Sequence, residues 1–141
     1  MDYETSVEVK APADAVWNVL ADPAEWPRWS ASTDSVEMLD GSIGPGKRAK
    51  VSQPRMRPMT WTVTEYVPGS TFTWTSKSGG VTTVAYHEVS PLDGDRSRLV
   101  LGVQQSGVLV PLTDLLLGKR IREYVDLEAA GHKARAEQHT G

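Results

Sequence analysis

Two polar side chains lie on segments that are otherwise apolar on one face. Residues 81–90 and 98–106 both alternate with the period of a strand. His87 lies on the apolar face of the first segment, and Gln105 lies on the apolar face of the second. A buried polar side chain needs a hydrogen-bond partner, so each is either satisfied by a neighbouring strand or contacts a ligand. The imidazole of His87 could also exchange a proton near neutral pH. If the first segment has the opposite phase, Tyr86 and Glu88 face inward instead.

A second pair of residues with acid/base chemistry lies near the end of the chain. Glu128 and His132 are four residues apart in a segment with helical periodicity, so their side chains share one face. In a pocket, a carboxylate beside an imidazole raises the pKa of the imidazole and can form an acid/base pair. More often such a pair is solvated where a helix leaves a sheet, and the sequence favours that interpretation.

Aromatic residues provide the candidate walls of a binding site. Trp61 and Trp74 alternate in phase with apolar neighbours, which places both on the concave face of a curved sheet. Each ring alone is best explained as part of the core. Together with Met59 and Tyr124, however, they would form a lining suited to a flat or greasy molecule. The three other tryptophans lie in short helical segments and are expected to pack there, with Trp29 nearest to the mouth of the cavity.

The elements that must position these residues follow from periodicity and turn chemistry. Alternation predicts seven strands, at residues 3–10, 35–39, 46–53, 59–67, 71–76, 81–90 and 98–106. Gly, Pro and Asp between them predict short connections, so neighbouring strands are antiparallel. Two short helical segments, from Pro12 to Asp22 and from Pro23 to Trp29, separate the first strand from the second.

The longest helix-compatible stretch runs from Pro111 to about Glu137. On a helical wheel, one arc of this stretch is apolar and carries Leu117, Ile121, Tyr124 and Val125. A sheet with one apolar face, followed by such a helix, must curl around the helix to bury both surfaces. The sequence therefore predicts an α+β fold.

The first turns of this helix differ from the rest. Leu112, Leu115 and Leu116 widen the apolar surface there, so we expect loops as well as the sheet to cover this end. Gly118 costs about 1 kcal/mol relative to alanine in a helix. It is explained by close packing against a strand or a mild bend, or by a gap left for a ligand.

Length and composition limit the class of protein. With 141 residues the chain is expected to form one domain, residues 1–141. It has no cysteine, a net charge of −3 and a pI near 5.6, so no overall basic field favours nucleic acid. The N-terminus lacks the apolar core of a secretory signal, and the most apolar run is too short to span a bilayer. We expect a cytoplasmic protein, as a monomer or homodimer.

Motifs for metals and cofactors are missing from the sequence. The histidines, at positions 87, 132 and 139, lack paired ligand spacing. The segment 44–48 has the spacing of neither a P-loop nor a dinucleotide fingerprint, and no Gly-x-Ser-x-Gly elbow occurs. We therefore expect no metal and no cofactor. The sequence identifies no catalytic residue.

Several stretches have the character of family landmarks. They are Val7-Glu8-Val9-Lys10-Ala11-Pro12 and the helix that follows, Trp26-Pro27-Arg28-Trp29, Gly44-Pro45-Gly46, the segment 61–69, Phe72-Thr73-Trp74 and Ser106-Gly107. With these the chain resembles, over essentially its whole length, the START-like (SRPBCC) superfamily, in the polyketide cyclase/dehydrase and lipid-transport group. The resemblance implies a helix-grip fold, in which a curved seven-stranded antiparallel sheet wraps around the C-terminal helix with a cavity between them.

The function expected from this resemblance is the binding or transport of a small hydrophobic molecule, lipid-like or polyketide-like. Strand alternation and the helical wheel direct five candidate ligand-binding residues into the cavity, namely Trp61, Trp74, His87, Gln105 and Tyr124. The alternative is a polyketide aromatase/cyclase or dehydratase that uses the same cavity. In that case protons would be moved by His87, Tyr86 or Glu128.

Overall fold

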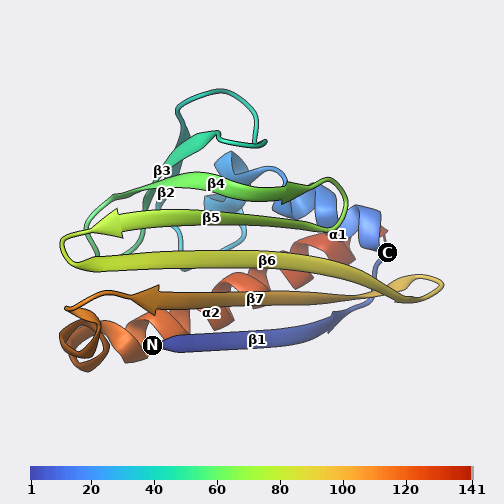
Figure 1. The fold of residues 1–141 in the computed structure, drawn as a ribbon. Coiled ribbons are helices and arrows are strands. Elements are labelled where there is room, and N and C mark those ends of the chain that lie inside the picture. Colours follow the sequence, from blue (N-terminus) through green and yellow to red (C-terminus); the bar gives the residue numbers. More distant parts are fainter. Residues whose placement is uncertain (141) are drawn as a thin grey trace.

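Seven strands form one antiparallel sheet in the order β1-β7-β6-β5-β4-β3-β2 (Figure 1). The structure, a computed structural model, describes residues 1–140 and the side chains up to residue 138. The strands are β1 (Asp2–Val9), β2 (Ser35–Met38), β3 (Arg48–Ser52), β4 (Met59–Val67), β5 (Thr71–Ser78), β6 (Val81–Asp93) and β7 (Arg96–Ser106). Strands β2 to β6 each pair with the next strand along the chain, whereas β1 pairs with β7, so that Asp2 lies opposite Gln104.

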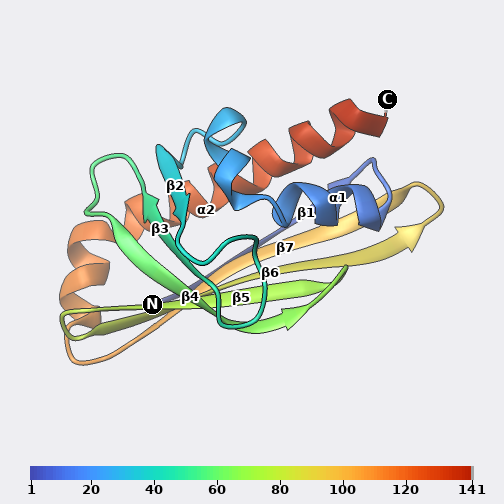
Figure 2. The ribbon, with the colours of Figure 1, turned by 90° about the horizontal axis from the view of Figure 1, so that it is seen from above.

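Helical elements lie on one side of this sheet (Figure 2). They are α1 (Ala13–Leu20), the 3-10 helix η1 (Pro23–Arg28) and α2 (Val110–Thr140). Helix α1 packs against β6, β7 and α2, so it fills the space between the sheet and the C-terminal half of α2. Pro23 begins η1 and Pro27 lies inside it, and proline in both positions favours a short 3-10 turn over a continued α-helix.

The second half of α2 is held by a narrow stripe of buried residues. They recur at intervals of four, three and four positions and are Val125, Ala129, His132 and Ala136. Beside the stripe, Gly131 lies directly against the backbone that follows η1. A Cβ atom there would be 2.3 Å from the carbonyl oxygen of Trp29. The helix approaches this segment so closely because Gly131 has no side chain.

Strand β4 contains an irregularity that keeps a charged residue in solvent. Its pairing with β5 shifts between Val63 and Glu65, so Thr64 forms a bulge. Before the bulge, Trp61 and Val63 are buried, as the alternation predicts. Beyond it Tyr66 packs against the core, 5.8 Å between ring centroids from Trp17, while Glu65 is exposed.

The predicted helix-grip architecture is confirmed, and each predicted strand and helix is present within a few residues of its expected limits. The largest difference is the hairpin of β6 and β7, which extends to Asp93 and Arg96. Pro91 lies inside β6, beside an irregularity in its pairing with β7. Proline is tolerated there because the irregularity removes the need for its missing N–H.

The expectation that loops cover the first turns of α2 is wrong. Leu112, Leu115 and Leu116 are 52%, 81% and 68% exposed. The side of the helix that faces the cavity carries Thr113 and Leu117. On the helical wheel Leu115 lies opposite this side, and Leu112 and Leu116 lie on its two flanks, where no described element covers them.

Two of the explanations offered for Gly118, close packing against a strand and a gap left for a ligand, are also wrong. A Cβ atom at this position would lie 2.1 Å from Oδ1 of Asp114, and that oxygen accepts a hydrogen bond from Nη2 of Arg122 at 3.1 Å. Gly118 therefore leaves room for an ion pair along the helix itself. It neither packs against a strand nor faces a space for a ligand.

The two glycines of α2 provide a matched test of the helix packing. We expect Gly131→Ala to lower the free energy of unfolding by about 1 to 3 kcal/mol, because the new Cβ meets backbone that cannot move aside. Gly118→Ala should be neutral or stabilising by up to about 1 kcal/mol, because the Asp114 side chain can rotate and alanine favours the helix. Urea unfolding measures both. Equal effects of the two substitutions would contradict the close contact between Gly131 and Trp29.

Candidate functional site

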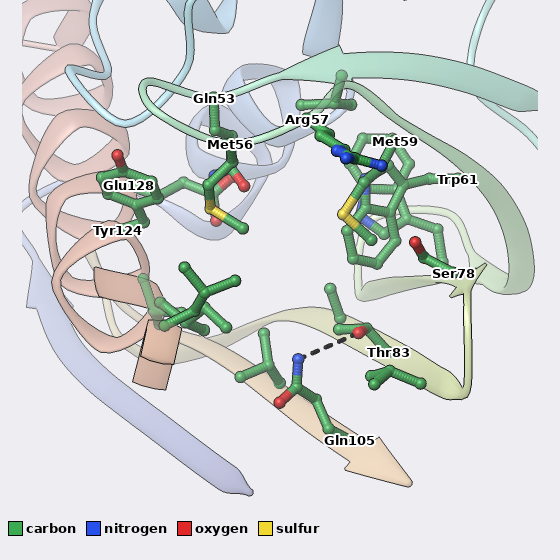
Figure 3. Close-up of a pocket in the computed structure, with 18 of the residues that line it drawn as sticks. Gln53, Met56, Arg57, Met59, Trp61, Ser78, Thr83, Gln105, Tyr124 and Glu128 are labelled. Atoms are coloured by element: carbon green, nitrogen blue, oxygen red, sulfur yellow. Dashed lines mark hydrogen bonds between the residues drawn. The ribbon is translucent and has the colours of Figure 1, made fainter. Parts of the chain in front are cut away.

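A cavity of about 420 Å³ lies between the inner face of the sheet and α2 (Figure 3). Residues of strands β3 to β7 form the sheet wall. The helix wall consists of Thr113, Leu117, Ile121, Tyr124, Val125 and Glu128. The volume and the mainly apolar lining are those of a site for a small molecule.

Strand β6 forms the centre of the sheet wall. Every second residue of its first half faces the cavity, as the period of a strand requires, and these residues are Val81, Thr83, Ala85 and His87. Ala85 lies between Trp74 of β5 and Val103 of β7 in the sheet register. Its small side chain leaves space at the middle of the wall.

The mouth of the cavity lies at the end where β5 turns into β6. Three lining residues are exposed: Arg57 in the β3–β4 loop, Ser78 at the end of β5 and Gly79 in the β5–β6 turn. Met56 lies beside Arg57 in that loop, and both side chains extend over the cavity (Figure 3). Access from solvent is therefore between these two connections and the first turns of α2.

The inner end of the cavity has an aromatic wall. The imidazole of His87 stacks on Phe72, with centroids 4.1 Å apart and an interplanar angle of 15°. Trp74 meets the same imidazole edge to face at 5.7 Å, and Trp26 packs against it at 5.5 Å. Trp61 continues the cluster, 5.9 Å from Trp74. Such rings offer flat apolar surfaces to a bound molecule.

A carboxylate lies between two buried imidazoles at this inner end. Oε2 of Glu128 is 4.0 Å from Nε2 of His87, and Oε1 of Glu128 is 3.8 Å from Nε2 of His132. The Glu128 side chain is 18% exposed, while the two histidine side chains are almost fully buried. Since Glu128 and His87 both line the cavity, a bound molecule can reach the carboxylate and the imidazole.

Hydrogen bonds to the outer nitrogen of each imidazole define where its proton lies. The Phe72 carbonyl oxygen is 3.1 Å from Nδ1 of His87, so this nitrogen carries the hydrogen and Nε2 presents a lone pair to Glu128. The Trp29 indole N–H donates to Nδ1 of His132 at 3.0 Å, so the neutral imidazole carries its hydrogen on Nε2. This nitrogen is 3.8 Å from Oε1 of Glu128, near the carboxylate but without a hydrogen-bond partner among the described residues. Glu128 thus faces a donor on one side and an acceptor on the other.

Burial and neighbouring charge set the ionisation of this group. Burial lowers the pKa of His87 to about 4, because an imidazolium there would lose its hydration, and the Glu128 carboxylate offsets this only in part. Burial alone would raise the pKa of Glu128. The N–H of His132 and the positive charge that the imidazoles can carry bring the pKa of Glu128 below its usual value. At neutral pH the cavity therefore holds a neutral His87 and an ionised Glu128, which are both proton acceptors.

A second polar point lies on β7. Nε2 of Gln105 donates to Oγ1 of Thr83 at 3.2 Å, across the pair that the sheet register places side by side (Figure 3). Oε1 of Gln105 is buried and has no hydrogen-bond partner among the described residues. A donor group on a molecule in the cavity would satisfy such an acceptor.

All five residues predicted from alternation and the helical wheel line the cavity, namely Trp61, Trp74, His87, Gln105 and Tyr124. The phase of β6 is the predicted one, because Tyr86 faces away and bonds Glu4, and Glu88 is exposed. Tyr124 also donates its hydroxyl hydrogen to the carbonyl of Pro54, which ties α2 to the β3–β4 loop. That the five residues bind a ligand stays a prediction.

Two expectations about the inner end of the cavity are wrong. Glu128 and His132 are not a solvated pair, because α1 packs on α2 and the Trp26 ring of η1 lies 4.9 Å from the His132 ring, which leaves His132 fully buried. Trp26, and not Trp29, lines the cavity. The ring of Trp29 lies in an outer groove under the guanidinium of Arg135, 5.0 Å from its centroid, and only its N–H reaches inward to His132.

The sequence analysis missed the cavity-lining residues that lie in loops. Thr33, in the segment after η1, and Gln53, Met56 and Arg57, around the β3–β4 loop, have no periodic neighbours to indicate their direction. Alternation from His87 places Ala85 on the same inward face, but its contribution is the space it leaves. No sequence pattern reports such a space.

Searches for other kinds of site gave two findings. Within residues 1–138, no three His, Asp or Glu side chains are arranged to hold a metal ion. No described helix combines the length and apolar character needed to cross a membrane. The cytoplasmic location stays a prediction.

The curved sheet, the long C-terminal helix and the cavity between them define a START-type helix-grip protein. The sequence profile of the family described as polyketide cyclase/dehydrase and lipid transport matches residues 1–137, and the chain belongs to this family. Among curated protein sequences, none matches the chain significantly.

Solved structures with the same fold come from several bacteria. A hypothetical protein from Helicobacter pylori has a TM-score of 0.83 at 17% identity, over 96% of this chain and 88% of that one. The Zhui aromatase/cyclase from a Streptomyces species has a TM-score of 0.71 at 21% identity, over 99% and 92%. A START superfamily protein from Mycobacterium smegmatis has a TM-score of 0.73 at 17% identity, over 99% of both chains. At such low identity these similarities show the fold.

Because His87 is buried in its neutral form, we expect the protein to lose stability in acid. Its pKa is about 4 in the folded protein and near 6.5 in the unfolded chain, so the unfolded chain binds the additional proton between these values. Stability should therefore fall as the pH is lowered through this range, by about 2 kcal/mol between pH 7.5 and pH 5. Urea unfolding of the parent and of His87→Gln at both pH values isolates the effect. The same pH dependence in both proteins would contradict it.

Proposed function

We propose that the protein binds a small, flat, apolar molecule in the cavity between sheet and helix. The observation that carries this proposal is a space of about 420 Å³ walled by Trp61, Trp74 and the aliphatic side chains of α2. Space of this size and lining is costly unless a ligand fills it, because apolar side chains lose contacts around a void. Membership of a family described by polyketide cyclisation and lipid transport supports the same class of ligand.

The polar points of the cavity favour particular functional groups on the ligand. Gln105 offers a buried acceptor oxygen on the sheet wall, and Glu128 offers a carboxylate at the inner end. Both accept hydrogen bonds, so hydroxyl or N–H groups on an apolar body fit them. An anionic group at the inner end would be repelled by the ionised Glu128. We therefore favour a hydroxylated, polyketide-like molecule over a fatty acid whose carboxylate enters first.

Filling the cavity provides the test of ligand binding. Ala85→Leu adds three carbon atoms at the middle of the sheet wall, where the side chain points into the cavity. We expect it to weaken binding of a neutral fluorophore such as N-phenyl-1-naphthylamine at least tenfold, while the melting temperature stays equal or rises as the void is filled. Fluorescence titration and thermal unfolding measure the two effects.

The matched control is Val84→Leu, which enlarges the neighbouring side chain on the outer face of the same strand. It should leave fluorophore affinity unchanged. If Ala85→Leu binds the fluorophore as the parent does, or if the parent binds none, the cavity is not the binding site.

A second candidate function, acid/base catalysis in the same cavity, is favoured by the position of Glu128. The carboxylate and Nε2 of His87 are both free to accept a proton at neutral pH and both face the cavity. Either group could remove a proton from a carbon between two carbonyl groups, as cyclisation of a polyketide-like chain requires. In a dehydration the same proton would then pass to the hydroxyl group that leaves as water.

Glu128→Gln separates binding from catalysis. If the protein dehydrates a polyketide-like β-hydroxy ketone, we expect this substitution to lower the rate about 100-fold or more, because the amide cannot accept the proton. Binding of the fluorophore should be retained within a few fold. Mass spectrometry follows the product, which is lighter than the substrate by one water. An unchanged rate would exclude Glu128 as the base, and no turnover by the parent would leave ligand binding as the function.

A further inference from the structure

Five exposed aliphatic residues follow one another closely in the segment before α2 and in its first two turns, and we call them the apolar tip. It consists of Val108, Leu109, Leu112, Leu115 and Leu116, with exposed fractions between 44% and 86%. The other large exposed hydrophobic residues of the described chain are scattered singly, at positions 39, 67, 92 and 127. Single exposed hydrophobic residues are ordinary, whereas a contiguous apolar patch marks a surface of interaction.

The apolar tip has a fixed position at one end of the molecule. The backbone N–H of Leu109 donates to the Gly80 carbonyl at 3.2 Å, which attaches the start of α2 to the β5–β6 turn. The Leu109 side chain packs over the same glycine, where a Cβ would come within 2.9 Å of it. Figures 1 and 2 show the first turns of α2 beside this turn, at one end of the sheet. The tip therefore adjoins the mouth of the cavity, although its leucines face away from the cavity.

The segments next to the apolar tip carry many basic residues. Three adjacent segments, the β3–β4 loop, the end of β5 and the start of α2, carry Arg55, Arg57, Lys77, Lys119, Arg120 and Arg122. The loop is connected to the helix, because Arg120 donates to the carbonyl of Arg55 at 3.1 Å. Within 107–122 the acidic residue is Asp114, which is paired with Arg122. Asp2, opposite Gln104 at this end of the sheet, and Glu123, next to Arg122, are also acidic, so the six basic residues outnumber three acidic ones here, in a chain whose net charge is −3.

We propose that the apolar tip docks on the surface of an anionic lipid bilayer. Exposed leucines on one side of a helix, next to lysine and arginine, are the features of a segment that lies in the interface of a membrane. Basic residues at such a surface are attracted by acidic lipids. Protein interfaces, in contrast, are anchored by buried aromatic residues, and the apolar tip has none. The basic residues next to the tip, which we call the basic rim, complement the charge of an acidic lipid surface. They would gain nothing from a neutral surface.

Docking in this orientation places the cavity next to the bilayer. The rim residue Arg57 and the β5–β6 turn form the mouth, so the mouth opens beside the bilayer when the tip is inserted. An apolar molecule could then pass between lipid and cavity with little contact with water. The docking surface rests on residues other than those proposed to hold the ligand, so it stands or falls independently of ligand identity.

Co-sedimentation with vesicles tests the proposal. The probes are vesicles of phosphatidylcholine alone and of an equal mixture of phosphatidylcholine and phosphatidylglycerol. We expect the parent to bind the mixed vesicles and the double variant Leu115→Ser, Leu116→Ser to bind them at least tenfold more weakly. The double variant Arg55→Gln, Lys119→Gln should weaken binding by about thirtyfold, because each substitution removes one charge near the surface.

The matched control replaces exposed aliphatic residues at the other end of the sheet. Val67 ends β4 and Leu92 lies near the end of β6, and both strand ends are opposite to the β5–β6 turn. Val67→Ser, Leu92→Ser should bind the mixed vesicles as the parent does. Circular dichroism and the melting temperature check that each variant is folded. We expect them to be folded because substitutions at exposed positions change stability little.

Three results would overturn the proposal. The first is a parent that binds neither vesicle, and the second is equal binding by the parent and by the leucine variant. The third is a parent that is a dimer in analytical ultracentrifugation and becomes a monomer through the leucine substitutions, since the tip would then be an interface between copies. Equal binding to neutral and acidic vesicles would contradict the role of the basic rim.

Discussion

The site depends on the way in which α2 is held at one end and separated from the sheet at the other. In its second half, the stripe around Ala129 packs tightly, and Gly131 allows contact with the backbone of Trp29. In its first half, the same side of the helix stands over the curved sheet with the cavity between them. A helix of 31 residues is stiff enough to carry the position of its packed half into the unpacked half. The void therefore persists because α1 and η1 support the helix at its C-terminal half.

A polar group inside this core is costly, and the structure shows how the cost is reduced. An ionised carboxylate and two imidazoles are desolvated, and apolar residues of similar volume would often give equal or greater stability. The Phe72 carbonyl and the Trp29 indole satisfy the outer nitrogens of the imidazoles, so Glu128 remains for the cavity to satisfy. Buried polar groups that face a cavity and have no full set of partners are typical of functional sites. The aromatic wall around His87 excludes water and strengthens the electrostatic contacts there.

The sequence predicted the residues whose direction follows from a regular period. Alternation placed His87 and Gln105 correctly because β6 and β7 are long and regular where they cross the cavity, and the helical wheel did the same for Tyr124. Prediction from the sequence failed where the surroundings of a side chain depend on tertiary contacts. The burial of His132 follows from coverage by α1 and η1, and the wheel shows only which side of α2 carries the residue. The exposure of Leu115 has the same origin, because a leucine is apolar whether or not another element covers it.

The order of strands also has a consequence for how the chain reaches this structure. Strands β2 to β7 form successive hairpins, and each can pair as soon as its neighbour along the chain is available. Strand β1 must wait, because Val9 pairs with Ser97 and Asp2 with Gln104, far along the sequence. Closing so long a loop is slow compared with forming a hairpin, since its entropy is lost before the contacts are gained. During synthesis on the ribosome the first strand to emerge is thus the last to find its partner, and its unpaired edge is exposed until β7 has been made.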